Sequence, residues 1–261
     1  MKKFYLPMLL IAAMILSIAG CGSSTSTTKS GDEVELKEDG VFSFVVSGEF
    51  YPFSYSDKNG KLDGFDVAVG KALAKEMGLK AKVDKQKFHG IVTAVKTNRF
   101  DAAVASHTIT PERMKAVNFS TPYYYSGPVL FVQKGSGIKN VNDLKGKNIA
   151  VAKGSTYESE AQKYSKDISV YDSDVTALRA LSEKKHDGVI TDSITGKQAI
   201  AKGFKVEEAE TLGTSEQAIA VSKKDKQLLK AINKALEQLR KDGTLKEISE
   251  KYLKTDITKK P

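Results

Sequence analysis

Short apolar runs alternate with segments of helical periodicity along most of the chain. Residues 42–47 and 101–106 have the length and composition of buried strands. Between them, apolar residues recur at helical spacing over 65–77, and Gly78 follows as a stop signal. Because strands separated by helices are usually parallel, this alternation predicts an α/β fold with mostly parallel sheets.

The alternation occurs in two successive sets, with a break at 123–127. The first set also contains a strand at 81–83 and a helix over 88–95. The second set has strands at 129–132, 148–152, 169–171 and 188–191, with helices from about 155, 174 and 193. A strand at 217–221 and two amphipathic helices between 225 and 252 follow. Each set is too small for a doubly wound domain, so we expect two α/β units side by side, which suits a chain of 261 residues.

The N-terminus has the form of a signal peptide. Two lysines precede an apolar run over 4–20 that is too short and too asymmetric for a good transmembrane helix. The run ends in Ile18-Ala19-Gly20-Cys21, which resembles the lipobox of bacterial lipoproteins. The resemblance implies a lipoprotein signal peptide over 1–20, cleavage before Cys21 and diacylation of its thiol. The alternative is that Cys21 lies in an uncleaved signal segment.

The residues after Cys21 are small and polar, without apolar periodicity. This composition predicts that 21–40, which includes the acylated cysteine, is a flexible tether and that the folded part begins near Val41. Cys21 is the only cysteine in the chain. We therefore expect no disulfide, no thiol nucleophile and no cysteine metal site in the mature protein.

Neither charge nor motifs indicate nucleic acid or an enzyme. The formal net charge is +9, but the lysines are scattered, and no arginine-rich run alternates with aromatic residues. Solubility and attraction to an anionic cell envelope explain the charge better. We find no Walker A loop, nucleophile elbow, HExxH motif or dinucleotide fingerprint, and the three histidines lack metal-ligand spacing. We expect no catalytic residue, no metal and no cofactor.

Residues 100–124 contain a strand, a hydroxyl-rich turn and a helix start in succession. A threonine and a proline begin the helix, which puts Arg113 in its first turn, where the macrodipole disfavours a cation. An anion in front of Arg113 would explain its position, because the guanidinium, free backbone N–H groups and the hydroxyls of Ser106 and Thr108 could bind one carboxylate. The alternative is a solvated arginine, paired with Glu112 or with nothing.

Two other strand ends carry polar groups. The strand at 149–152 is followed by Gly154-Ser155-Thr156, where a helix N-terminus with hydroxyls suits a carboxylate, although any capped helix looks similar. Asp192 ends the strand at 188–191, in the place where open α/β sheets bind ligands. Its alternative role is to cap the next helix.

Aromatic residues occupy a turn after the first strand, at 50–53, which is a poor place for a core. His107 lies inside the hydroxyl-rich turn and could face a ligand, but packing or solvent exposure explains it better. Together these places offer anion donors on two segments, one acid for an ammonium group, and aromatic walls. This is the set of groups that an α-amino acid needs.

At these residues the chain resembles the extracytoplasmic solute-binding proteins of polar amino-acid ABC transporters. The resemblance covers about residues 41–253. Its landmarks are FYPF at 50–53, GFDVAV at 64–69, FDAAVASHTITPER at 100–113, NFSTPYY at 118–124, DLKGKNIAVAKGST at 143–156 and HDGVITD at 186–192.

The resemblance implies a two-lobed α/β fold of the type 2 periplasmic-binding-protein class. Each lobe would be a mixed sheet flanked by helices, and two hinge strands would join the lobes. The larger lobe would comprise 41–126 plus 217–261, and the smaller lobe 127–216. The two lobes would close on one amino acid.

The family match also implies a role for each site residue. Phe50 and Phe88 would flank the ligand side chain. The α-carboxylate would be held by Ser106, Thr108 and Arg113 from the larger lobe and by Ser155 and Thr156 from the smaller lobe. Asp192 would hold the α-ammonium group.

Three positions bear on the ligand side chain. Ser47 stands where some cationic amino-acid binders carry an acid, which argues against lysine or arginine as ligand. Lys153 and Tyr157, near the second clamp, favour an acidic, amide or sulfur-containing side chain. The resemblance implies an extracytoplasmic, lipid-anchored monomer. Its partners would be an amino acid, an ABC permease with its ATPase, and the membrane.

Two alternatives remain open at this point. One is an enzyme on the same scaffold, such as a dehydratase, for which Glu49, His107 and Asp192 are the candidate acids and bases. The other is a ligand-sensing partner of a receptor.

Overall fold

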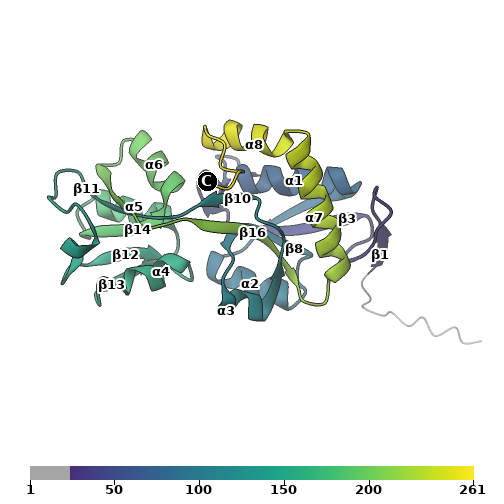
Figure 1. The fold of residues 1–261 in the computed structure, drawn as a ribbon, viewed down its shortest axis with the longest axis horizontal. Coiled ribbons are helices and arrows are strands. Elements are labelled where there is room, and N and C mark those ends of the chain that lie inside the picture. Colours follow the sequence, from purple (N-terminus) through teal and green to yellow (C-terminus); the bar gives the residue numbers. More distant parts are fainter. Residues whose placement is uncertain (1–23) are drawn as a thin grey trace, which may run out of the picture.

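The computed structural model describes residues 24–261, so the predicted signal peptide and Cys21 lie outside the described residues. The described chain forms two lobes, which lie side by side in Figure 1. Each lobe contains a sheet with helices on both faces. No helix in this part of the chain is both long and apolar enough to cross a bilayer.

The larger lobe contains a six-stranded sheet in the order β10-β16-β8-β3-β7, with β9 also paired to β16. Its strands are β3 (Val41–Val46), β7 (Lys80–Lys85), β8 (Ala102–Thr108), β9 (Val117–Phe119), β10 (Tyr124–Ser126) and β16 (Ser215–Ser222). Its helices are α1 (Phe65–Met77), α2 (Phe88–Lys96), α3 (Pro111–Ala116), α7 (Lys226–Lys241) and α8 (Thr244–Leu253). The segment between β3 and α1 forms a small sheet of β4 (Glu49–Phe50), β5 (Ser54–Ser56) and β6 (Leu62–Asp63).

Alternating side chains bury this sheet on both faces. Phe42 and Phe44 of β3 pack with α1, α7 and α8, whereas Val45 packs on the other face with Ile91 of α2. The predicted helix over 65–77 is confirmed, and it ends at Gly78 in the left-handed conformation that favours glycine.

The residues before Val41 differ from the predicted tether. β1 (Ser24–Thr27) and β2 (Glu33–Leu36) form an antiparallel hairpin, and Val34 and Leu36 are buried in the main core of the larger lobe. Asp32 in the hairpin turn forms ion pairs with Lys230 and Lys234 of α7. The polar composition of this segment misled the prediction, because two apolar side chains on one face of a short strand suffice to dock it.

The smaller lobe contains a five-stranded sheet in the order β13-β12-β14-β11-β15. Its strands are β11 (Pro128–Gln133), β12 (Ile149–Ala152), β13 (Ile168–Tyr171), β14 (Gly188–Asp192) and β15 (Val206–Thr211). Its helices are η1 (Val141–Leu144), α4 (Thr156–Ala161), α5 (Asp174–Ser182) and α6 (Ser193–Ala201). α5 and α6 pack on one face of the sheet, and α4 and η1 pack on the other.

Both sheets are mixed rather than mostly parallel. In the larger lobe β3 pairs in parallel with β7 and β8, but β16 runs antiparallel to β8. In the smaller lobe β12 pairs in parallel with β13 and β14, but β11 runs antiparallel to β14. The antiparallel pairs arise where the chain leaves one lobe and returns to it.

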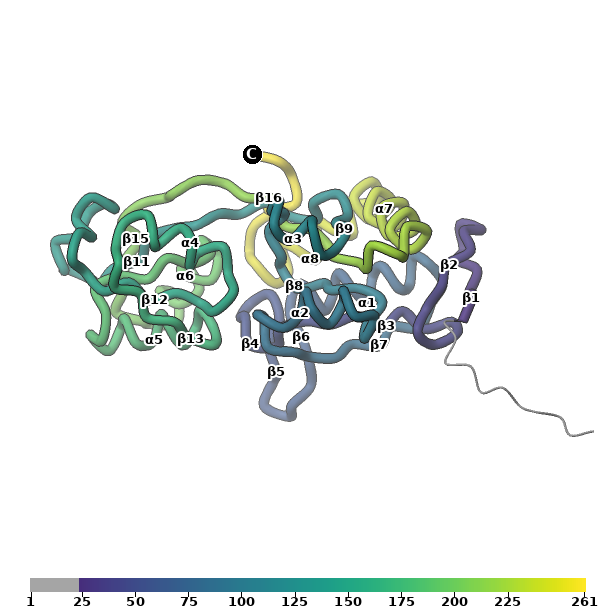
Figure 2. The backbone as a smooth tube through the Cα atoms, turned by 90° about the horizontal axis from the view of Figure 1, so that it is seen from below, coloured from purple at the N-terminus to yellow at the C-terminus, as the bar shows by residue number. Residues whose placement is uncertain are grey.

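The chain passes between the lobes twice, and Figure 2 shows the two connecting segments running together along one edge of the molecule. β10 ends at Ser126 in the larger sheet and β11 begins at Pro128 in the smaller one, whereas β15 ends at Thr211 and β16 begins at Ser215. The segments are in close contact, because a Cβ atom on Gly127 would lie 2.0 Å from the carbonyl oxygen of Gly213. Only glycine fits at Gly127 without a shift of the backbone.

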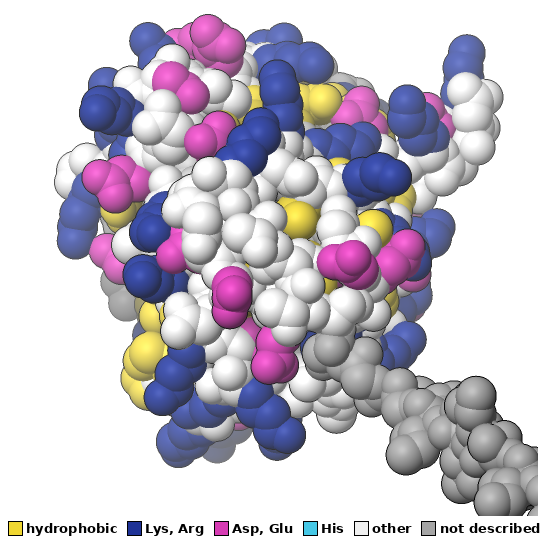
Figure 3. Space-filling model, turned by 90° about the vertical axis from the view of Figure 1, so that its right-hand side faces the viewer, with side chains coloured by type: hydrophobic (Ala, Val, Ile, Leu, Met, Phe, Trp, Pro, Cys, Tyr) yellow, Lys and Arg dark blue, Asp and Glu magenta, His cyan; other side chains and the backbone are white. Residues whose placement is uncertain are grey.

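Basic side chains are dispersed over the outer end of the larger lobe. Figure 3 shows the larger lobe from its outer end, where Lys and Arg side chains are interspersed with Asp and Glu. Opposite charges therefore alternate over this face, and they do not form one continuous basic patch.

Candidate functional site

A cavity with about 510 Å³ of empty space, including its open mouth, lies between the lobes at the ends of their central strands. A cleft between two lobes is a common place for a small-molecule site. The larger lobe contributes Ser47, Glu49, Phe50, Phe88, Ser106, Thr108 and Arg113. The smaller lobe contributes Ala152, Ser155, Thr156, Tyr157, Asp172, Ser173 and Asp174.

The cavity holds one half-buried cation, Arg113. Thr110 caps α3 by accepting a hydrogen bond from the Arg113 backbone N–H at 3.1 Å, which fixes the start of the helix. Arg113 Nη1 donates to the Thr108 carbonyl at 2.9 Å, and Nη2 donates to the Gly154 carbonyl of the smaller lobe at 3.0 Å. Burial lowers the pKa of the guanidinium to about 10, so it remains charged at neutral pH.

No carboxylate within residues 24–261 lies within ion-pair distance of Arg113. The predicted alternative of a surface ion pair with Glu112 is therefore not what the structure shows. A charged guanidinium with only neutral carbonyl partners can accept an anion from the cavity.

Hydroxyl groups from both lobes line the same cavity as this guanidinium. Thr108 at the end of β8 and Ser106 two residues earlier come from the larger lobe, and Ser155 and Thr156 at the start of α4 come from the smaller lobe. Ser155 Oγ donates to the Ala152 carbonyl at 2.7 Å, so this hydroxyl can accept a further hydrogen bond from a ligand.

A buried hydrogen-bond network, which the sequence analysis did not predict, fixes Ser106. Its backbone has a φ of 57°, in the left-handed region. Ser106 Oγ donates to Asp66 at 2.8 Å, the Tyr123 hydroxyl donates to Asp66 at 2.6 Å, and the Ser106 N–H donates to the Tyr123 hydroxyl at 2.9 Å. Burial raises the pKa of Asp66 to about 7. These bonds fix the conformation of Ser106 at the cavity wall.

Aromatic rings form two walls. Phe88 begins α2, its ring lies under the Arg113 guanidinium at 5.6 Å, and it stacks on His107 with centroids 4.5 Å apart. Phe50 stacks on Phe53 at 4.8 Å. His107 is 1% exposed, and burial lowers its pKa well below the usual value. His107 therefore supports the Phe88 wall as a neutral side chain and does not line the cavity.

The two buried acids of the smaller lobe lie differently relative to the cavity. Asp192 is 1% exposed and does not line the cavity; its Oδ1 accepts from the Ile194 N–H at 2.8 Å and caps α6. The helix-cap role that the sequence left open is therefore observed. The buried acid on the cavity wall is Asp174, which accepts from the Thr191 hydroxyl at 2.5 Å. Burial raises the pKa of each carboxyl to about 6.

Asp174 carried a weaker signal in the sequence. It begins a predicted helix three residues after the predicted strand at 169–171, whereas Asp192 directly follows its strand. Two other expectations also need revision. Lys153 is exposed and does not line the cavity, whereas Tyr157 does, and its hydroxyl lies 3.5 Å from Asp192. Lys153 therefore gives no support for an acidic ligand side chain.

Comparison with known proteins gives consistent results. The L-cystine-binding protein TcyJ of Escherichia coli K12 is 32% identical over 256 residues, which cover 96% of each chain. The probable amino-acid-binding protein YxeM of Bacillus subtilis is 34% identical over 267 residues, covering 99% of this chain and 97% of YxeM. A solved structure of an ancestral arginine-binding protein bound to arginine is 36% identical with a TM-score of 0.78, over 82% of this chain and 98% of that one.

A family model matches residues 42–255, which include both lobes and both connecting segments. Both of these relatives are named as binding proteins. The two-lobed architecture is that of the type 2 periplasmic binding proteins. The chain therefore belongs to the bacterial extracellular solute-binding proteins, family 3.

Proposed function

We propose that the protein holds one α-amino acid in the cavity between the lobes and delivers it to an ABC importer. The observation that carries this proposal is Arg113, a charged group that faces the cavity with only carbonyl partners. Arg113 binds the α-carboxylate together with the hydroxyls of Thr108, Ser155 and Thr156. Because these groups come from both lobes, the ligand stabilises the closed arrangement by its higher affinity for that state.

The α-ammonium group pairs with the acids of the smaller lobe. Asp174 contacts the ammonium group directly. Asp192 acts indirectly, through the Tyr157 hydroxyl, which lies 3.5 Å from the Asp192 carboxylate. Phe50 and Phe88 enclose the ligand from the larger lobe. Ser106 completes the polar wall in the conformation set by Asp66 and Tyr123.

The cavity favours a polar or sulfur-containing side chain over an acidic one. Glu49, Asp172 and Asp174 all line it, and a side-chain carboxylate by itself would be repelled by them. The named ligands of the relatives, cystine and arginine, both carry a cationic nitrogen far from the first amino-acid head. By the family resemblance, Ser47 stands where some binders of cationic amino acids carry an acid, which favours the sulfur-containing class over a purely cationic side chain.

Binding without turnover fits the cavity better than catalysis. Of the three candidate acids and bases, only Glu49 lines the cavity, and it is ion-paired with Lys87 at 2.9 Å. His107 and Asp192 are buried behind the walls. We expect a bound amino acid to be recovered with unchanged mass after prolonged incubation, and a shifted mass would favour the enzyme reading.

The ligand is identified by mass spectrometry of small molecules that co-purify with the full-length protein, followed by calorimetry with the compound found. An α-amino acid bound at a one-to-one ratio supports the proposal, whereas a ligand without an α-amino-acid head contradicts it. Uptake of that amino acid should also fall in a strain that lacks the gene. Unchanged uptake would favour the receptor-partner alternative.

The lipid anchor is a separate proposal, because Cys21 lies outside the described residues. We expect a fatty-acid analogue to label the wild-type protein in cells and to leave the Cys21→Ser variant unlabelled. Label retained on the serine variant would contradict acylation at this residue.

A further inference from the structure

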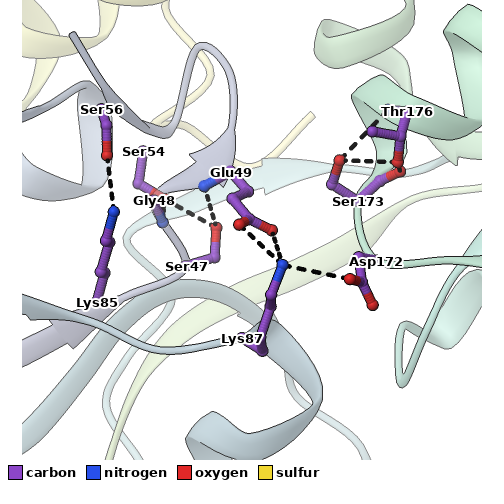
Figure 4. Close-up of polar contacts among 10 residues, drawn as sticks. All are labelled: Ser47, Gly48, Glu49, Ser54, Ser56, Lys85, Lys87, Asp172, Ser173 and Thr176. Carbon is purple, nitrogen blue, oxygen red and sulfur yellow. Dashed lines mark hydrogen bonds and ion pairs between the residues drawn. The ribbon is translucent and has the colours of Figure 1, made fainter. Parts of the chain in front are cut away.

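The cavity has a second charged end, away from Arg113. There, Lys87 Nζ lies 2.9 Å from both carboxylate oxygens of Glu49 and 3.3 Å from Asp172 of the smaller lobe. Glu49 and Asp172 line the cavity. Figure 4 shows the lysine between the two carboxylates, with its ammonium group spanning the gap between the lobes. We call Glu49, Lys87 and Asp172 the outer cluster.

The topology places the two carboxylates of the outer cluster one strand away from the Arg113 end, one in each lobe, and Lys87 follows β7, the strand beyond β3. The residues at the Arg113 end come from the segments that follow β8 and β12. Glu49, in contrast, follows β3, and Asp172 follows β13. β3 neighbours β8 in the larger sheet, and β13 neighbours β12 in the smaller sheet. Neighbouring strands lie about 4.8 Å apart, so the two ends of the cavity are separated by a short molecular span.

The outer cluster offers charges of both signs to a ligand. A distal group that is only cationic must compete with Lys87 for the same two carboxylates. A distal group that is only anionic pairs with Lys87 but meets Glu49 and Asp172. A group with both an ammonium and a carboxylate satisfies all three residues, because the Lys87 ammonium that it displaces from the acids can pair with its carboxylate.

The wall next to the outer cluster is also polar. Ser47 is 7% exposed, lines the cavity and shares a hydrogen bond with Ser54 at 3.1 Å. Ser173 lines the cavity from the smaller lobe, where it caps α5. These hydroxyls suit a ligand whose far end is hydrated and charged.

We propose that the outer cluster is a second head-group site, so that the protein selects an α-amino acid whose side chain ends in a second ammonium–carboxylate head. This inference rests on the proposed function, which supplies the first head at Arg113. The span fits such a ligand, because the α-carbons of two disulfide-bonded cysteine units lie about 4.4–6.8 Å apart. A two-headed amino acid of this length reaches both ends at once.

Calorimetry on the full-length protein, purified in detergent and extensively dialysed, tests the proposal. The two-headed probes are L-cystine and meso-diaminopimelate, and the one-headed probes are S-methyl-L-cysteine, L-arginine and L-glutamate. We expect at least one two-headed probe to bind at least tenfold more tightly than every one-headed probe. Equal or tighter binding of a one-headed probe would overturn the second site.

The variant Lys87→Met separates the two ends. We expect it to weaken the best two-headed probe at least tenfold and to change the affinity for S-methyl-L-cysteine less than twofold. Lys85→Met removes the same charge from a lysine whose ammonium contacts Ser56 at 3.3 Å and neither carboxylate of the outer cluster, so it should leave both affinities near wild type. Equal effects of Lys87→Met on one-headed and two-headed probes would also overturn the proposal.

The outcomes distinguish this inference from the proposed function. Arg113→Ala should weaken one-headed and two-headed probes alike. If one-headed amino acids bind through Arg113 and two-headed probes have no advantage, the outer cluster is only an ion-pair contact between the lobes, and the proposed function stands. If no amino acid binds, both proposals fail.

Discussion

Arg113 in the larger lobe donates a hydrogen bond from Nη2 to the backbone carbonyl of Gly154 in the smaller lobe, at 3.0 Å. The contact joins the two lobes at the inner end of the cavity. A Cβ atom on Gly154 would also lie 2.9 Å from the Cβ atom of His89, so the lobes are in van der Waals contact here. A carboxylate bound at Arg113 would therefore touch both lobes at the place where they meet.

Replacement of Arg113 by alanine should weaken amino-acid binding at least about thirtyfold. Loss of one partner of a desolvated charge pair costs on the order of 2–5 kcal/mol, and each 1.4 kcal/mol is about tenfold in affinity. Calorimetry with the tightest-binding amino acid measures this, with Glu112→Ala as the control, because that residue is exposed on the same helix. Affinity within threefold of wild type would rule out Arg113 as the carboxylate site.

Binding should weaken as the pH falls from 7.5 to 5.0. Asp174 and Asp192 have pKa values of about 6 because they are buried, so both are protonated at the lower pH and cannot pair with an ammonium group. For a pKa of 6, the loss at pH 5.0 is about tenfold for each carboxylate that the ligand uses. Calorimetry at both pH values measures the change, and an affinity that rises on acidification would contradict the pairing.

The variants Asp174→Asn and Asp192→Asn separate the two acids. We expect Asp174→Asn to remove most of the preference for the ligand over its desamino analogue, because it removes the carboxylate on the cavity wall. Asp192→Asn should reduce this preference less and destabilise α6 through its cap. The reverse order would place the ammonium group at Asp192.

The hairpin of β1 and β2 should contribute to the stability of the larger lobe. Leu36 is fully buried against its core, and truncation of a buried leucine to alanine typically costs about 2–5 kcal/mol. Urea unfolding of Leu36→Ala measures this loss. Glu35→Ala is the control, since Glu35 is exposed on the same strand and its loss should cost less than about 0.5 kcal/mol. If both variants matched wild type, the hairpin would not be part of the folded body.

Substitution of Gly127 by alanine should disturb the connection between the lobes. The new Cβ atom would meet the Gly213 carbonyl at 2.0 Å, so the two connecting segments must separate. We expect a loss of stability of roughly 1–3 kcal/mol and a larger radius of gyration of the loaded protein in small-angle scattering. Gly90→Ala is the control, because there the new atom meets only the flexible Gln86 side chain. Identical scattering of loaded wild type and Gly127→Ala would show that the segments tolerate separation.

Periodicity was sufficient to predict the α-helices and the central strands of both sheets. Alternation placed the strand at 42–47 within one residue of β3, and capping residues placed the starts of α3 and α4 at Thr110 and Ser155. The β1–β2 hairpin was missed because its eight strand residues contain only two that dock on the core, Val34 and Leu36. The direction of β16 was missed because a strand that returns from the other lobe carries no local sign of its orientation.

The site was partly predictable for similar reasons. Ser106, Thr108 and Arg113 come from one local segment, and the cavity contains all three. Asp66 was not predicted as the support of Ser106, because the two residues are 40 positions apart and meet only through the packing of α1 on β8. Whether Asp174 or Asp192 faces the cavity depends on the depth of each strand end, which sequence spacing does not encode.

A crystal structure of the protein with its bound amino acid tests the central claim most directly. The account predicts density for the ligand between the lobes, with its α-carboxylate within hydrogen-bond distance of the Arg113 guanidinium and its α-ammonium group nearest to Asp174. Density outside this cavity, or a ligand inside it whose carboxylate points away from Arg113, would contradict the account.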